Sequence, residues 1–191
     1  MAHGDVEIEI KVRVENVKPL IMLMEKEGKY EGETRQLDEY FTPAHIDYLK
    51  QVPMKDWLRL RWEKDKASIT YKSYHYDEEG KTTGCDELET NIESLDKMQK
   101  IFKVLGFRSL AKVDKVRRLW RYKDYDIAID EVSGLGSFVE IEFMLKSEDW
   151  KKTSSEMMGF LRSLNVGKVE RTYQGYPYMI MYPEKIEYFD Q

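Results

Sequence analysis

Apolar and charged residues alternate near the start of the chain, over about residues 5–14. Ile8 and Ile10 are among the apolar positions, and the positions between and beside them are charged: Glu7, Glu9 and Lys11. Because successive side chains of a β-strand point to opposite faces, the pattern predicts a strand with one apolar and one charged face. Two carboxylates and a lysine would then share one surface.

A second stretch repeats this arrangement far downstream. Val139 and Ile141 are apolar, and they alternate with Glu140 and Glu142. The alternation predicts another strand that carries two carboxylates on the face opposite its apolar residues. If the two strands belong to one sheet, four carboxylates can converge on a hard cation.

Similar patterns predict further strands and three amphipathic helices. Apolar residues at helical spacing mark the helices at residues 17–28, 93–105 and 150–164. Alternation marks the other strands at residues 29–41, 58–63, 69–72, 87–89, 110–122 and 125–131. The tyrosine-rich tail could add a closing strand or a flap, but Pro177 and Pro183 interrupt a central strand there. These elements predict an α+β protein dominated by an antiparallel sheet.

The charges on the polar faces of these strands are grouped by sign. Basic residues follow the middle strands: Arg59, Arg61, Lys72, Lys115 and Arg117. For any single strand, a polar face in contact with water is a sufficient explanation. For the whole set, the grouping favours about eight antiparallel strands in a β-barrel around an anionic ligand and its metal, with the amphipathic helices packed outside. The interior of such a barrel has room only for side chains or one small ligand.

Composition narrows the class of protein. The 191 residues, 41% hydrophobic and 35% charged, fit a single domain over residues 1–191. A chain of this length can bury a core that needs no disulfide or structural metal for stability. A net charge of −5 argues against a general nucleic-acid binder. Cys85 has no second cysteine to bond with, and no apolar run approaches the roughly 18 residues of a membrane span. Since no apolar signal segment precedes the first strand, we expect a cytoplasmic protein without a membrane anchor.

An ordered set of motifs between Val6 and Lys146 resembles the CYTH superfamily of triphosphate tunnel metalloenzymes, which includes class IV adenylyl cyclases and thiamine triphosphatases. The motifs are Glu7-x-Glu9-x-Lys11, Asp38-Glu39-Tyr40-Phe41, Leu58-Arg59-Leu60-Arg61, Tyr71-Lys72, Glu87-Leu88-Glu89, Lys115-Val116-Arg117, Ile129-Asp130-Glu131-Val132 and Phe138-Val139-Glu140-Ile141-Glu142. The Gly134-Leu135-Gly136 turn before the last pair of glutamates looks more like the cyclase branch. The resemblance implies a triphosphate tunnel made by the barrel.

The chemistry of the residues agrees with that implication. Mg²⁺ or Mn²⁺ would take carboxylate ligands and phosphate oxygens, and the candidate ligands are Glu7, Glu9, Glu140 and Glu142. The candidate phosphate-binding residues are Lys11, Arg59, Arg61, Lys72, Lys115, Arg117 and Arg171, of which Lys11, Lys72 and Lys115 are also the candidate catalytic residues. Three acids could orient these bases or assist a second metal: Glu87, Glu89 and Asp130. Structural ion pairs between strands are the simpler alternative for each acid.

The resemblance implies conversion of ATP to cyclic AMP and pyrophosphate. Two alternatives stay open: a triphosphatase that releases orthophosphate from tripolyphosphate, thiamine triphosphate or a nucleotide, and a module that binds polyphosphate without turnover. The expected partner is a small-molecule triphosphate, without nucleic acid or membrane, and the aromatic tail is compatible with a homodimer. After Arg171-Thr172-Tyr173 the tail departs from the family pattern, because residues 174–178 do not look helical. Arg171 could reach the phosphates from a mobile lid or belong to an aromatic surface patch.

Overall fold

The computed structural model describes residues 8–77, 82–145 and 149–189. The strands are β1 (Ile8–Val14), β2 (Lys29–Thr42), β3 (Asp56–Glu63), β4 (Lys66–Tyr76), β5 (Thr82–Ile92), β6 (Arg108–Tyr122), β7 (Tyr125–Val132), β8 (Gly136–Phe143) and β9 (Val169–Arg171). The α-helices are α1 (Lys18–Glu27), α2 (Leu95–Val104), α3 (Trp150–Arg162) and α4 (Tyr176–Met181), and the short 3₁₀ helices are η1 (Tyr48–Lys50) and η2 (Pro183–Lys185). None of the helices in these ranges is long and apolar enough to cross a membrane.

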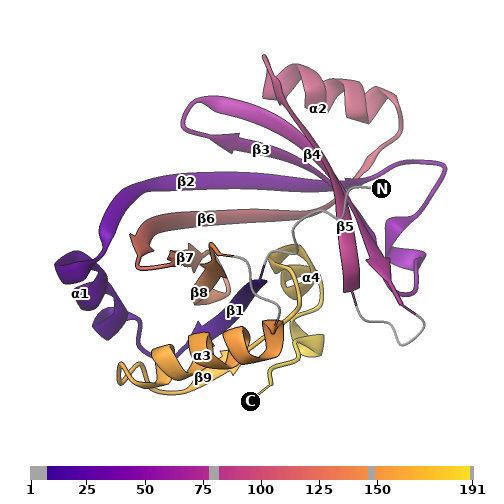
Figure 1. The fold of residues 1–191 in the computed structure, drawn as a ribbon. Helices are drawn as coiled ribbons and strands as arrows, with labels where there is room; N and C mark the ends of the chain where they lie inside the picture. The colour runs from indigo at the N-terminus through magenta and orange to yellow at the C-terminus, as the bar shows by residue number, and fades with distance from the viewer. Residues whose placement is uncertain (1–7, 78–81, 146–148, 190–191) are drawn as a thin grey trace. The chain divides into compact units, whose positions relative to one another are not determined.

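The strands form a nine-stranded antiparallel sheet in the order β5-β4-β3-β2-β6-β7-β8-β1-β9 (Figure 1). This confirms the predicted α+β class and the predicted antiparallel sheet. The short strand β9, which the sequence analysis did not assign, brings the described strands to nine instead of about eight. The order begins at β5 and ends at β9, so these are the edge strands of the sheet. Closure of the sheet into a tunnel stays a prediction.

The chain divides into two compact units, which β2 and β6 both traverse. The first unit contains residues 1–34, 115–175 and 182–191, and the second contains residues 35–114 and 176–181. Each unit has its own part of the sheet and its own apolar cluster.

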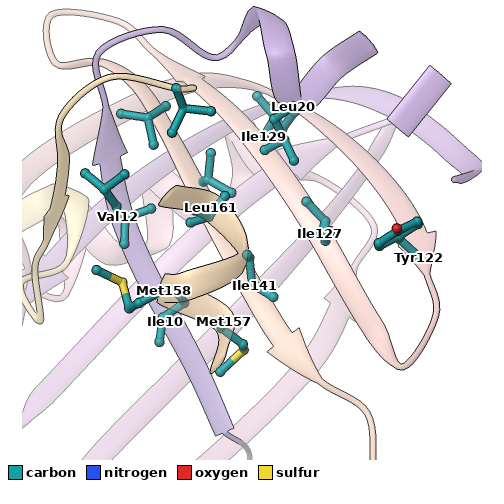
Figure 2. Close-up of a cluster of buried hydrophobic side chains, with 14 of the residues drawn as sticks. Ile10, Val12, Leu20, Tyr122, Ile127, Ile129, Ile141, Met157, Met158 and Leu161 are labelled. Carbon is teal, nitrogen blue, oxygen red and sulfur yellow. The ribbon is translucent and has the colours of Figure 1, made fainter. Parts of the chain in front are cut away.

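In the first unit, the apolar face of the sheet packs against α1 and α3. Figure 2 shows Ile10 of β1 and Ile141 of β8 facing Met157 and Leu161 of α3, and all four side chains are buried. Each side chain of this kind contributes about 1.5–3 kcal/mol when it leaves water. The apolar half of the predicted alternation is therefore the half that points to the helices, and the charged half faces away from them.

In the second unit, β3 packs its apolar side chains against α2. Leu58 and Leu60 of β3 belong to one buried cluster with Phe41 and Phe102. The ring of Phe102 meets that of Phe41 edge-on at 5.0 Å between centroids, and it stacks on Phe107 at 4.5 Å. Because this apolar cluster fixes which way β3 faces, the residues between its leucines point to the opposite side of the sheet.

The tail is helical, which the sequence analysis did not predict. Residues 174–178 were expected to lack helix, but Tyr176–Met181 forms α4, followed by η2. Pro177 is the second residue of α4, where proline has no intrahelical hydrogen bond to lose and its fixed φ suits the helix. The proline that seemed to interrupt structure is thus part of the first turn of a helix.

Candidate functional site

The polar face of the first unit gathers the charged residues of the two glutamate strands. The pairing of β1 with β8 sets Glu9 opposite Glu142 and Lys11 opposite Glu140. Directly paired residues of an antiparallel ladder share a face of the sheet, so these four side chains lie on one surface. On the same face, β6 and β7 add Lys115, Arg117 and Asp130. We call these seven residues the carboxylate face.

Carboxylates on this face are crowded enough to perturb one another. The pKa of Glu9 is raised to about 7, first by desolvation and then by the charge of Glu140. Lys11 and Arg117 oppose this shift without cancelling it. The side chain of Glu9 keeps contact with solvent, so a cation can reach it. A carboxyl group whose charged form is disfavoured by its neighbours is one that a divalent cation would relieve.

The predicted metal ligands are brought together only in part. Glu7 lies outside the described residues, whereas Glu9, Glu140 and Glu142 share the carboxylate face. Among the residues that the structure describes, no three acidic, histidine or cysteine side chains form a group that could hold a metal by themselves. Mg²⁺ usually keeps several waters and binds through one or two carboxylates plus substrate phosphates. The three glutamates fit an ion that arrives with a phosphate.

Asp130 holds two of the predicted phosphate-binding bases. Its buried carboxylate accepts a hydrogen bond of 2.8 Å from Nζ of Lys115 and two of 2.7 Å from Nε and Nη2 of Arg117. Burial alone would raise the pKa of Asp130, but the hydrogen bonds from Arg117 and the charge of Lys115 outweigh it and hold the pKa at about 2. Asp130 therefore stays charged and fixes both cations.

Arg117 connects this pair to a predicted metal ligand. The same Nη2 that contacts Asp130 also donates to Oε2 of Glu140. Burial lowers the pKa of Lys115, and the positive charge of Arg117 lowers it further, while Asp130 and Glu140 oppose that shift. The result is a continuous network of alternating charge from Lys115 to Glu140.

Lys11 is held by the C-terminal segment of the first unit. Its Nζ donates to the backbone carbonyl of Gln174 at 3.0 Å. The Gln174 side chain in turn donates to the carbonyl of Lys185 and accepts from the N–H of Glu187, both at 3.0 Å. Sequence reasoning missed Gln174, and a lone glutamine in an irregular tail gives no signal by which to find it.

Arg171 is not on the carboxylate face. Its register partner in β1 is Val12, whose side chain is in the apolar core, whereas Lys11 beside it points the other way. The guanidinium lies 4.8 Å from the ring centroid of Tyr173, and its buried Nε has no hydrogen-bond partner among the described residues. The sequence analysis named Arg171 as a phosphate-binding candidate from the Arg171-Thr172-Tyr173 pattern, with an aromatic patch as the alternative, and the strand register places it on the face opposite Lys11.

The polar face of the second unit carries the other predicted bases. Arg61 binds the carboxylate of Asp38 through two hydrogen bonds of 2.7 Å, and Nη1 of Arg59 is 3.8 Å from the same carboxylate. Nη2 of Arg59 donates to Thr70 at 2.9 Å. Its buried Nε has no hydrogen-bond partner among the described residues.

The predicted supporting acids of this unit lie beside the bases that they were expected to orient. Glu87 pairs with Lys72 at 2.9 Å. Glu89 accepts from Thr70 at 2.7 Å and lies 3.4 Å from Nη2 of Arg59. With Asp38, Arg59, Arg61 and Thr70, these residues form what we call the arginine face. Asp38 was quoted only as part of a motif, because its pairing with Arg61 depends on a strand register that the sequence does not show.

Similarity to known proteins extends over most of the chain. A model of the CYTH domain family matches residues 5–176 of the chain. A protein of Methanocaldococcus jannaschii named "Putative adenylate cyclase MJ0240" is 34% identical over 165 residues, which cover 85% of this chain and 91% of that protein.

Solved structures share the fold. The PH1819 protein of Pyrococcus horikoshii OT3 is similar with a TM-score of 0.70 and 26% sequence identity, over 93% of this chain and 99% of that one. A Vibrio parahaemolyticus protein described as a "putative adenylate cyclase" has a TM-score of 0.68 over 93% of this chain and 99% of its own. At 19% identity, the second likeness concerns the fold alone.

Proposed function

The chain belongs to the CYTH domain family, and we propose that it is a metal-dependent enzyme that converts ATP to cyclic AMP and pyrophosphate. The observation that carries the proposal is the carboxylate face, where Glu9 and Glu142 oppose each other beside the network of Asp130, Arg117 and Glu140. Two acids that face each other across the strands suit a cation, and the neighbouring bases suit phosphate. The adenylate cyclase name of the relative from Methanocaldococcus jannaschii favours this reaction over others on a triphosphate.

The residues that would hold Mg²⁺ or Mn²⁺ are Glu9, Glu140 and Glu142, together with the predicted Glu7. A bound divalent ion would supply charge neutralisation at the phosphates and would lower the pKa of an oxygen nucleophile. The pKa of Glu9, raised first by burial and then by the charge of Glu140, supports this assignment, because a bound cation would favour the charged carboxylate.

Each face carries bases that would bind phosphate groups and stabilise charge on a departing pyrophosphate. Arg59, Arg61 and Arg117 offer forked donors, whereas Lys72 and Lys115 offer point charges. In the reaction the ribose 3′ oxygen forms a bond to the α-phosphorus, the bond from that phosphorus to the β-phosphate oxygen breaks, and the hydroxyl proton is lost. Positioning of the 3′ oxygen in line with the leaving group, and cations fixed before reaction, account for the acceleration.

The test is a product-resolved assay. The protein is incubated with ATP and either Mg²⁺ or Mn²⁺, and nucleotides and phosphates are separated. We expect cyclic AMP and pyrophosphate in equal amounts, and no product in excess chelator. Formation of ADP and orthophosphate without cyclic AMP would contradict the cyclase assignment.

A triphosphatase is the second candidate. The favouring observation is that the contacts of both faces involve charged groups that would meet phosphates, and such contacts serve any triphosphate. A triphosphatase predicts release of orthophosphate from tripolyphosphate far faster than formation of cyclic AMP from ATP. Tight, metal-enhanced binding of tripolyphosphate, ATP and thiamine triphosphate without any turnover would instead indicate a binding module.

A further inference from the structure

Asp38 is a buried charge to which the proposed reaction assigns no role. Its side chain is 3% exposed, and it lies on β2 directly opposite Arg61 of β3. A carboxylate that is almost closed to water persists when it is paired and hydrogen-bonded, and Asp38 is paired with an arginine through both of its oxygens. This carboxylate holds groups that were identified independently as phosphate-binding candidates.

The geometry of the pair leaves part of Arg61 available. Asp38 engages Nε and Nη2 of Arg61, so the Nη1 amino group is outside this two-bond contact. The guanidinium of Arg59 approaches the same carboxylate with its Nη1. Its Nη2 donates a hydrogen bond to the hydroxyl of Thr70. One acid thereby limits the orientations of two neighbouring guanidinium groups on a rigid strand.

We propose that Asp38 is a positioning residue that orients Arg59 and Arg61 to bind the phosphates of the substrate. The inference rests on the proposed function, since it concerns the same triphosphate. A bidentate contact with a planar guanidinium fixes both its direction and its rotation, which a single charge contact does not do. Asp38 therefore acts on phosphate affinity through the arginines without touching the phosphate.

The competing explanation is that the pair of Asp38 and Arg61 only stabilises the fold. The chain contains a control pair with the same forked geometry. Asp114 binds Arg35 in the same forked manner, through bonds of 2.9 and 2.6 Å, within the same unit. That pair is exposed, with 60% of the Arg35 side chain and 40% of the Asp114 side chain accessible. Neither residue belongs to the arginine face, so Asp114→Asn removes a comparable pair without disturbing a proposed phosphate contact.

The experiment measures binding of magnesium tripolyphosphate by calorimetry and KM and kcat for ATP. For Asp38→Asn we expect the dissociation constant and KM to rise by about tenfold with a smaller change in kcat, because arginines that lose their orientation bind the ground state less well. Asp114→Asn should stay within about twofold of the wild type. In an Arg61→Ala background, Asp38→Asn should add less than about threefold, because its main target is gone.

Two further results keep the test decisive. Asp38→Glu retains the buried charge, so it provides a folded variant if Asp38→Asn does not fold, and it should also weaken tripolyphosphate binding because the longer side chain displaces the guanidinium groups. Unchanged tripolyphosphate binding in a folded Asp38 variant, or an equal loss with and without Arg61, would overturn the inference. Absence of cyclic AMP from the wild-type reaction would count against the proposed function alone, since binding of tripolyphosphate requires no turnover.

Discussion

The carboxylate face and the arginine face share one arrangement of charged side chains but differ in the residues around it. On each, a buried aspartate holds two bases: Asp130 binds Lys115 and Arg117, and Asp38 binds Arg61 and lies near Arg59. The two faces differ in the charges of the residues that are paired across neighbouring strands.

Both faces have acids opposite bases, such as Glu140 with Lys11 on one and Asp38 with Arg61 on the other. The carboxylate face also has an acid opposite an acid, Glu9 facing Glu142. Like charges directly opposite each other are destabilising unless a counter-ion joins them. This difference is the basis for proposing the cation at the carboxylate face.

The largest expected effect is on stability, at the more buried of the two aspartates. Asp130→Asn would leave Lys115, which is 4% exposed, and Arg117 beside it without their common partner. Removing one member of a buried ion pair costs about 3–5 kcal/mol, and we expect a loss of that size in urea unfolding. The control is Asp126→Asn on the same strand, whose pair with Arg121 is half-exposed and should cost under about 1 kcal/mol. Equal losses in both variants would contradict the comparison.

The next effect concerns the metal. Glu142→Gln should raise the magnesium concentration for half-maximal activity by on the order of 10–100-fold, because it removes a candidate ligand. Glu142 is a cleaner choice than Glu140, which also contacts Arg117. Glu87→Gln on the arginine face should leave the magnesium requirement unchanged. If both substitutions raise the required magnesium concentration equally, the metal site is not confined to the carboxylate face as proposed.

The pH dependence of stability gives a third test. The pKa of Asp130 falls from an ordinary 3.8 to about 2 in the folded chain. A depressed carboxyl pKa stabilises the fold above the ordinary value, and this contribution is lost as the pH falls towards the folded value. The stability difference between wild type and Asp130→Asn should therefore shrink by about 2 kcal/mol between pH 5 and pH 2. A difference that is constant over this range in acid titrations of unfolding would refute the assignment of the charge.

The smallest effect is expected at an exposed pair of the arginine face. Glu87 and Lys72 are 44% and 34% exposed, so Glu87→Gln should change the free energy of unfolding by less than about 1 kcal/mol. Thermal unfolding at low and high salt measures this directly, and the small difference should vanish at high salt. A loss as large as that at Asp130 would show that exposure does not separate the two kinds of pair.

Much of the fold follows from side-chain alternation. The strand around Ile10 and the strand around Ile141 were predicted with the correct faces, because a period of two assigns each residue to a side of the sheet without knowledge of its neighbours. The helical spacing of residues 95–104 was equally clear. Asp130 could be named as a supporting acid because it belongs to one of the motifs that resemble the CYTH superfamily.

The rest depends on contacts that alternation does not determine. Asp38 and Arg61 meet through strand register. Arg171 was a phosphate-binding candidate because Arg171-Thr172-Tyr173 resembles the family pattern, which does not show that the strand pairs it with Val12. The helix α4 was missed because of Pro177. Proline breaks a helix when it lies in the helix interior, but it is tolerated in the first turn, where Pro177 lies. Gln174 was missed because it accepts the hydrogen bond from Lys11 through its own backbone carbonyl. A pattern of side-chain types gives no information about a backbone contact.

The contact between Lys11 and Gln174 has a consequence for the field at the carboxylate face. Lys115 is restrained by a carboxylate, whose negative charge cancels much of the ammonium's effect at a distance. The carbonyl of Gln174 restrains Lys11 as a dipole without net charge. This bond fixes the amine without adding a further negative charge, so neutralisation of Lys11 comes from the carboxylates around it, Glu140 opposite it and Glu9 on the same strand.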